Sequence, residues 1–171
     1  MSILINLRSV TFEGVGASFS VEGSFETGVL ELGDLRFEPR GPAPYELSFV
    51  HVGEGVHATG RVTFEARTTC VRCLRVFDLE IKSKLEEVYY REPGTDEHGD
   101  ELPCIGDDDT IDIEPLLRES LIVELPFAPL HDPACAGLCA RCGADLNEGD
   151  CGCADEPDAD HPFASLKDLI K

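Results

Sequence analysis

Cysteine is the residue type in this chain with the most to offer chemically. Five of the eight cysteines gather near the C-terminal end, at Cys135, Cys139, Cys142, Cys151 and Cys153. A Cys-x-x-Cys pair followed by glycine, as in Cys139–Gly143, turns two thiolates toward one ion, because glycine permits the tight turn. The pattern predicts a closed, structural zinc knuckle in which Cys139 and Cys142 are the surest ligands. Five cysteines compete for four places, and an iron–sulfur cluster or a metal-free loop are the alternatives.

A second Cys-x-x-Cys pair, Cys70 and Cys73, lies between two strand-like patterns. We expect it at the tip of a hairpin, as a buried structural pair or as half of a second metal site completed from elsewhere in the fold. A thioredoxin-type redox pair is disfavoured, because such pairs open a helix whose dipole lowers the thiol pKa. His131 precedes the cluster and is either a ligand or, the favoured reading, a capping or surface residue. Cys104 stands alone in an acidic loop, and we expect no role for it.

Motifs that carry catalysis are absent from the sequence. It has no His-Glu-x-x-His, no phosphate-binding Gly-x-x-x-x-Gly-Lys-Ser/Thr loop, no Gly-x-Gly-x-x-Gly and no Gly-x-Ser-x-Gly. No spacing singles out a pair of catalytic carboxylates. We therefore expect a protein that is not an enzyme and has no catalytic residues.

The elements that must position the cysteines show a period of two. Apolar residues alternate with polar ones at Leu47 and Phe49, across 62–66 and across 77–85, which indicates antiparallel strands with one wet face. Asp112 and Pro115 begin a helix over about 112–125. The expected fold class is α+β: an antiparallel β-sheet or partly closed barrel-like core with one main helix, a zinc knuckle and a short C-terminal helix. We expect a core domain over 1–132, a knuckle module over 133–154, and an acidic linker with a docking helix over 155–171.

Charge limits the partners. The formal net charge is −20, from 34 acidic and 14 basic side chains. Such a surface repels phosphate backbones and attracts basic partners. One basic segment (residues 61–84) is the exception, and its basic side chains are Arg61, Arg67, Arg72, Arg75, Lys82 and Lys84. No apolar run approaches the roughly 20 residues of a membrane-spanning helix, and no secretory signal opens the chain, so we expect a cytoplasmic protein without membrane contact.

Several segments together resemble the YceD family of large-subunit ribosomal RNA accumulation proteins. They are Thr69–Leu74 with its Cys-x-x-Cys, the acidic-apolar stretch Ile113–Asp132, the tail Pro162–Lys167, and the Gly-Leu-Cys-x-x-Cys-Gly-x-x-Leu-Asn core of the cysteine cluster. The resemblance spans roughly residues 60–171, and the cluster is similar to the cysteine-rich branch of the family. Other branches lack the cluster, so the shared function does not need it everywhere.

The resemblance implies a non-enzymatic factor in large ribosomal subunit biogenesis, supporting the synthesis, processing or accumulation of 23S rRNA. Genes of the family commonly neighbour the gene for a small zinc-ribbon protein of the large subunit, which makes a basic ribosomal protein the expected partner. The acidic charge agrees with this interpretation. The alternative is direct binding of the 23S rRNA precursor through the basic segment. The sequence leaves the oligomeric state open.

Overall fold

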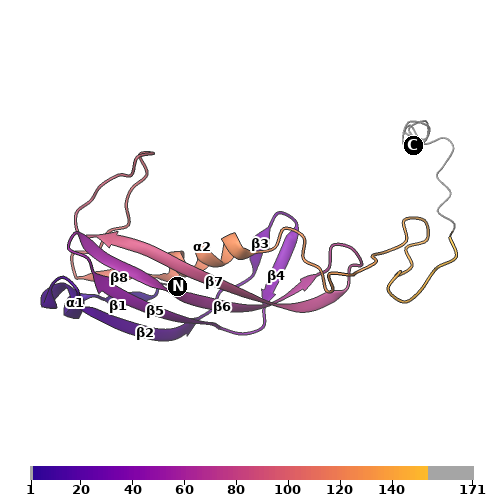
Figure 1. Cartoon of the computed structure of the whole chain (residues 1–171), viewed down its shortest axis with the longest axis horizontal. Helices are drawn as coiled ribbons and strands as arrows, with labels where there is room; N and C mark the ends of the chain where they lie inside the picture. Colours follow the sequence, from indigo (N-terminus) through magenta and orange to yellow (C-terminus); the bar gives the residue numbers. More distant parts are fainter. Residues whose placement is uncertain (1, 154–171) are drawn as a thin grey trace.

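The computed structural model describes residues 2–153, and its framework is an open antiparallel sheet (Figure 1). Six strands form this sheet: β2 (Ser18–Phe25), β3 (Leu30–Leu32), β4 (Leu35–Pro39), β5 (Ala43–His51), β6 (Gly55–Thr69) and β7 (Val76–Tyr90). Their order is β2-β5-β6-β4-β3, with β7 on the other side of β6. The expected antiparallel sheet is therefore confirmed in its open form, and it does not close into a barrel.

The longest feature of the sheet is the β6–β7 hairpin, with 15 residues in each strand. Its register runs from Gly55 opposite Tyr90 to Thr69 opposite Val76, so every residue of one strand has a partner on the other. We call residues 70–75, which join the two strands, the hairpin tip. The expected position of Cys70 and Cys73 between two long strands is confirmed.

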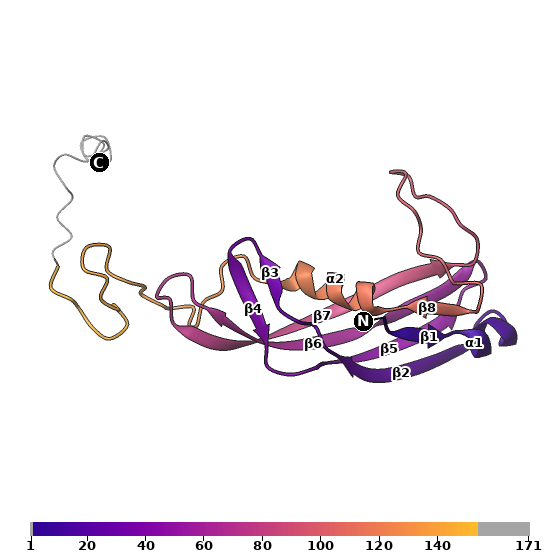
Figure 2. The same ribbon diagram turned by 180° about the vertical axis from the view of Figure 1, so that it is seen from behind.

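The core lies on one face of the sheet, where helix α2 (Glu114–Glu124) packs against β7 (Figure 2). Leu117 and Leu121 of the helix are fully buried, as are Phe49 and Phe64 on the strands. The alternation that predicted half-buried strands is visible along β7, where Ile81, Ser83 and Leu85 are buried and the residues between them are exposed. One face of the sheet thus builds the core, as a period of two requires.

A smaller two-stranded sheet anchors the N-terminal end to the start of α2. It pairs β1 (Leu4–Asn6) with β8 (Thr110–Asp112), and helix α1 (Arg8–Glu13) follows β1. Asp112 joins the parts, because one carboxylate oxygen accepts hydrogen bonds from the backbone N–H groups of Ile3 (2.9 Å) and Glu114 (3.0 Å). The short helix α1 and the partner of β1 were not foreseen, because three- and six-residue elements carry too little periodicity to be recognised.

Of the remaining predictions about the fold, one is confirmed and the others stay predictions. The helix predicted over about 112–125 is confirmed as α2. The division of the chain into domains stays a prediction, and its C-terminal docking helix, with Phe163, Leu166 and Ile170, lies outside the described residues. Among the residues that the structure describes, no helix is long and apolar enough to cross a membrane.

Candidate metal centres

The hairpin tip presents two thiols from a tight turn. The N–H of Cys70 donates to the carbonyl of Arg75 (2.9 Å), and the N–H of Leu74 donates to the carbonyl of Cys70 (2.9 Å). Leu74 adopts the left-handed conformation, at φ 61°, which turns the chain back toward β7. Both Cys70 and Cys73 are buried. Their closeness comes from this local turn, as the Cys-x-x-Cys spacing predicts.

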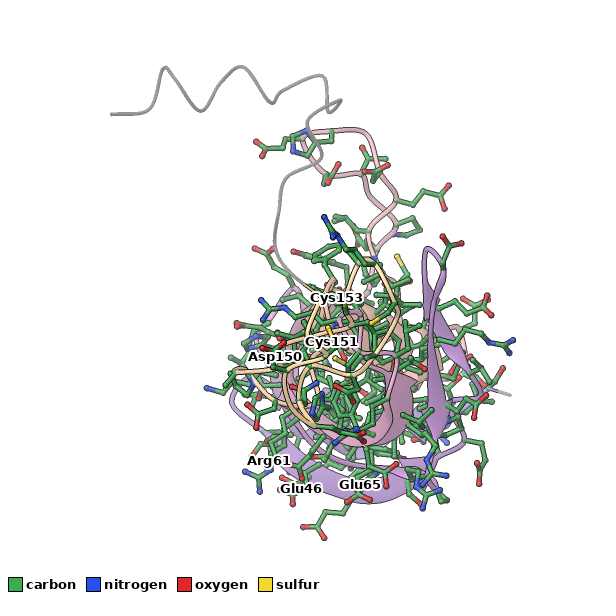
Figure 3. The ribbon with its side chains drawn as sticks, turned by 90° about the vertical axis from the view of Figure 1, so that its right-hand side faces the viewer. Glu46, Arg61, Glu65, Asp150, Cys151 and Cys153 are labelled. Carbon is green, nitrogen blue, oxygen red and sulfur yellow. The ribbon has the colours of Figure 1, made fainter. Side chains whose placement is uncertain are left out.

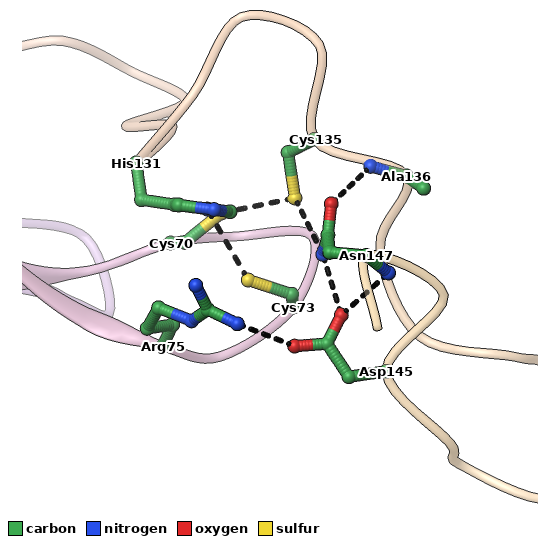
Figure 4. A network of polar contacts seen from close by, with 8 residues as sticks. All are labelled: Cys70, Cys73, Arg75, His131, Cys135, Ala136, Asp145 and Asn147. Atoms are coloured by element: carbon green, nitrogen blue, oxygen red, sulfur yellow. Dashed lines mark hydrogen bonds and ion pairs between the residues drawn. The ribbon is translucent and has the colours of Figure 1, made fainter. Parts of the chain in front are cut away.

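The chain after α2 returns to this tip and brings His131 and Cys135 to it (Figure 4). The return is held by backbone pairing, since the N–H of Val71 donates to the carbonyl of Pro129 (3.0 Å). The Sγ atoms of Cys70 and Cys135 lie 3.8 Å apart, and Nδ1 of His131 lies 3.4 Å from Sγ of Cys73. We call Cys70, Cys73, His131 and Cys135 the inner set, and their ligand atoms all lie within 4.8 Å of one another.

The remaining clustered cysteines form an outer set, Cys139, Cys142, Cys151 and Cys153, whose Sγ atoms also lie within 4.8 Å of one another. Its knuckle closes through the N–H of Gly143, which donates to the carbonyl of Cys139 (2.9 Å). Gly143 and Gly152 have φ values of 72°, a left-handed conformation that side-chain-bearing residues rarely adopt. The outer thiols are half-buried or exposed, in contrast to the buried inner ones.

The structure thus answers a question that the sequence left open. Of the five clustered cysteines, Cys135 joins the hairpin tip and the other four stay together. His131, for which a capping or surface role was favoured, contacts the thiol of Cys73. Cys104 is exposed and belongs to neither set. Two cysteine-rich sets, rather than one, could each hold a metal ion.

The thiols of each set differ in acidity. Burial disfavours the thiolate of Cys70, yet hydrogen bonds from His131 and from backbone N–H groups lower its pKa to about 5, while burial raises the pKa of Cys73. In the outer set, backbone N–H groups of Cys142 and Arg141 lower the pKa of Cys139 to about 6. Contacts with the neighbouring thiols raise the pKa of Cys153 to about 12. Hydrogen bonding thus favours the thiolates of Cys70 and Cys139, and a bound cation would replace the protons of the thiols that ligate it.

Asn147 is a residue near the candidate metal ligands that sequence reasoning did not single out. Its Nδ2 donates to Sγ of Cys135 (3.5 Å), and its Oδ1 accepts from the N–H of Ala136 (2.8 Å). Asp145 lies beside it and pairs with Arg75 of the hairpin tip (3.0 Å). The Leu-Asn end of the cluster motif is the sequence signal that marks this position, and its meaning depends on contacts that only the fold reveals.

The basic segment does not form one patch. Arg61, Arg67, Lys82 and Lys84 lie on the open face of the sheet, where Arg61 stands opposite Glu46 on β5 and Lys84 on β7, whereas Arg72 and Arg75 belong to the hairpin tip. Glu46, Arg61 and Glu65 project outward from this face (Figure 3). Ion pairs join Arg61 to Glu46, Arg67 to Asp78, Arg75 to Asp145, and Lys82 to Glu80. Arg72 instead donates to the carbonyl of Cys135 (2.9 Å). Most of the positive charge is therefore engaged within the chain.

Fold and site together define an α+β protein whose antiparallel sheet carries two candidate metal centres at one end of its longest hairpin. A family model described as "Large ribosomal RNA subunit accumulation protein YceD" matches residues 58–170, and the chain belongs to this family. The matched range begins within β6 and contains both sets of residues that could hold a metal ion. The resemblance noted from the sequence is confirmed.

Relatives extend the comparison without adding a described activity. An uncharacterised protein of Mycobacterium bovis is 36% identical over 104 residues, which is 59% of this chain and 50% of that protein. One of Mycobacterium leprae is 33% identical over 107 residues. A chloroplastic homologue of Arabidopsis thaliana, named a large ribosomal RNA subunit accumulation protein, is 36% identical over 63 residues, which is 36% of this chain and 20% of that protein. The chain spans about half the length of the mycobacterial relatives, and no solved structure matches it.

Proposed function

We propose that this protein is a non-enzymatic cytoplasmic factor that supports accumulation of 23S rRNA by binding a basic ribosomal protein of the large subunit. Membership of the YceD family supports the process. Charge supports the kind of partner, because a chain of net charge −20 attracts cationic proteins and repels phosphate. The small zinc-ribbon protein of the large subunit remains the preferred partner.

The observation that carries the choice of partner is the pairing of the basic segment's side chains with carboxylates of the same chain. Four of its six basic side chains form ion pairs with carboxylates of the same chain, and a fifth, Arg72, donates to a backbone carbonyl. Among the described residues, only Lys84 of the segment has no such partner. Binding of a phosphate backbone requires free cations that displace counterions. A protein partner therefore fits this surface better than direct contact with rRNA, which is the second candidate function.

Exposed carboxylates in the loop between β7 and β8 offer a surface to a cationic partner. Glu92, Glu101 and Asp107 are exposed there and take part in no ion pair among the described residues. Asp108 and Asp109 are less suitable for substitution, because Asp108 accepts a hydrogen bond from Thr110 and Asp109 pairs with Arg91. Substituting the first three carboxylates tests the surface without disturbing the loop's own contacts.

The test uses the full chain and two baits, the purified small zinc-ribbon ribosomal protein and a transcribed fragment of 23S rRNA. We expect binding to the protein that weakens as salt rises, because screening reduces attraction between opposite charges. Replacing Glu92, Glu101 and Asp107 by their amides should weaken it, whereas the same change at Glu22, Glu26 and Asp34, which are exposed on β2 and in the turns on either side of β3, controls for net charge. If the protein instead binds only the rRNA fragment, and the Lys82→Glu, Lys84→Glu double variant loses that binding, the second candidate function is favoured.

The metal that we propose for the outer set is zinc. Four thiolates without a water position make a closed tetrahedral site, which is the structural type of zinc site. The segment around these cysteines has few buried apolar side chains of its own, so a metal would supply the free energy that orders it. Zinc would then have a structural role, and the ribosomal partner would be recognised by the protein surface.

A further inference from the structure

We propose that Cys70, Cys73, His131 and Cys135 bind a second zinc ion, separate from the outer set, and that this ion fastens the hairpin tip to the segment after α2. The inner and outer sets share no residue. The proposal concerns a metal centre and its structural consequence, and it does not depend on which ribosomal component the protein binds.

Interatomic distances in the inner set match a tetrahedron around one zinc ion. Two thiolates at about 2.3 Å from zinc in tetrahedral geometry lie about 3.8 Å from each other, and a thiolate and an imidazole nitrogen lie about 3.6 Å apart. The structure places the Sγ atoms of Cys70 and Cys135 at 3.8 Å, and Sγ of Cys73 and Nδ1 of His131 at 3.4 Å. These two distances therefore fit a single bound ion, and the other ligand atoms of the set lie within 4.8 Å of one another.

The same distances disfavour other uses of these thiols. Cys70, Cys73 and Cys135 are free thiols in the structure and form no disulfide. An iron–sulfur cluster binds its thiolates through different iron atoms and needs them spread around the cluster, whereas here all four ligand atoms lie within 4.8 Å. One borderline cation with mixed sulfur and nitrogen ligands remains, and zinc is the natural occupant of a Cys₃His site.

The contact between the hairpin tip and the segment after α2 buries little apolar surface, so a bound metal would supply much of its stability. Cys70, Cys73 and Cys135 are 0%, 6% and 3% exposed, and they form a small cluster of their own, apart from the main core. Only partly buried apolar residues, Phe77, Leu130 and Leu138, pack against it. So little apolar area gives a weak contact, whereas a structural zinc contributes folding free energy directly. The ion would hold the chain after α2 to the hairpin tip.

Hydrogen bonds also connect the inner set to the loop of residues 136–153, which carries the outer set and which we call the outer loop. Asn147 of the outer loop donates to the thiol of Cys135, and Arg72 donates to its carbonyl. The N–H of Leu138 donates to the carbonyl of Arg72 (3.1 Å), and Gly137 lies so close to that carbonyl that a Cβ there would be 3.2 Å from it. Groups that hydrogen-bond to metal ligands fix their orientation. The inner ion would thereby set the position of the outer loop on the hairpin tip.

The decisive experiment isolates the inner centre within the full chain. In the Cys142→Ser, Cys151→Ser double variant the outer set is disabled and the inner ligands are untouched. We expect two zinc ions per wild-type chain by native mass spectrometry and one in the variant. X-ray absorption of the variant's zinc should show three sulfur ligands and one imidazole nitrogen.

Substitution of His131 gives a matched test of the ligand set. His131→Ala in the double variant should weaken zinc binding at least tenfold, whereas His131→Cys should retain the ion and change its surroundings to four sulfurs. Cys104→Ser, which removes a thiol outside both sets, should leave two ions bound. The proposal would be overturned if the Cys142→Ser, Cys151→Ser variant binds no zinc, if its zinc has no imidazole nitrogen ligand, or if His131→Ala leaves the zinc affinity unchanged. None of these results depends on ribosomal binding.

Discussion

The Sγ atoms of Cys70 and Cys135 lie 3.8 Å apart although 65 positions separate the two residues in sequence. One thiol belongs to the hairpin tip between β6 and β7, and the other belongs to the chain that follows α2. This contact joins the sheet to the cysteine-rich loop, and the loop's other attachments lie close around it.

Removing a ligand from one of the two sets should loosen only the part of the chain that this set holds. Cys142→Ser should expose residues 139–153 to protease, whereas Cys135 should stay attached to the hairpin tip, because the two sets share no ligand. Cys70→Ser should open the chain from about residue 128 onward. Limited proteolysis with mass spectrometry of the fragments distinguishes the patterns, and Cys104→Ser is the control. Identical cutting in both variants would show that the sets act as one unit.

Gly60 should resist substitution by alanine. Its Cβ would collide with the backbone oxygen of Glu46 and lie 2.7 Å from Cδ2 of Leu47, where β5 pairs with β6. We expect Gly60→Ala to lower the free energy of unfolding by about 1–3 kcal/mol, the usual cost of overpacking. Gly41→Ala is the matched control, because nothing lies within 4 Å of its Cβ and its φ is not left-handed. Urea unfolding measures both, and equal effects would contradict the predicted strand contact.

Phe64 should contribute strongly to the core. It is fully buried on β6, within the main core cluster. Phe64→Ala should cost about 3–5 kcal/mol, the range for removing a buried aromatic ring. Val123→Ala, on a side chain that is 79% exposed on α2, should change stability by less than about 0.5 kcal/mol. Chemical unfolding monitored by circular dichroism compares the two, and a small effect at Phe64 would mean that this part of the core is loosely packed.

Asp112 should make stability depend on pH. Burial alone would raise the pKa of its carboxyl, but hydrogen bonds from the N–H groups of Glu114 and Ile3 hold the pKa below its usual value. A carboxyl with a depressed folded-state pKa stabilises the fold above its unfolded pKa, near 4, and the contribution disappears as pH falls through the lower folded-state value.

Asp112→Asn should therefore flatten the decline of stability between about pH 5 and pH 3, and Asp112→Ala should cost about 1 kcal/mol near neutral pH through loss of its hydrogen bonds to the N–H groups of Ile3 and Glu114. Urea unfolding across this range, with chelator present in every sample so that metal release does not contribute, measures the effect. Asp34→Asn, at an exposed position, is the control. Parallel curves for the wild type and Asp112→Asn would show that this carboxylate is not coupled to folding.

Local patterns predicted much of the fold. The alternation at 77–85 predicted a half-buried strand because side chains on successive residues point to opposite faces, and β7 confirms it. The signals at Asp112 and Pro115 predicted α2 for a similar reason, because both residues lie within one turn of its start. The structure makes Ile113 the N-cap, and the carboxylate of Asp112 accepts a hydrogen bond from the N–H of Glu114. The order of the strands was beyond the sequence, because pairing joins residues far apart along the chain.

Surface charge also separates what the sequence could predict from what only the structure shows. The sequence showed six basic side chains within the basic segment, and their number suggested an RNA-binding surface. The sheet places Arg61 opposite Glu46 and Arg67 opposite Asp78, so pairing across strands neutralises them. Whether a charge is free depends on its neighbours in space, which the linear sequence does not contain.

The sequence by itself determined the composition of the possible metal ligands, the acidic character of the chain, the strands with one wet face and the family resemblance. Only the tertiary structure decided that Cys135 and His131 belong with Cys70 and Cys73, and that Cys139, Cys142, Cys151 and Cys153 stand apart. The reason is physical. Periodicity and turn chemistry act between residues a few positions apart, whereas coordination requires atoms within a few ångströms of one point, and here the path of the chain after α2 sets that distance.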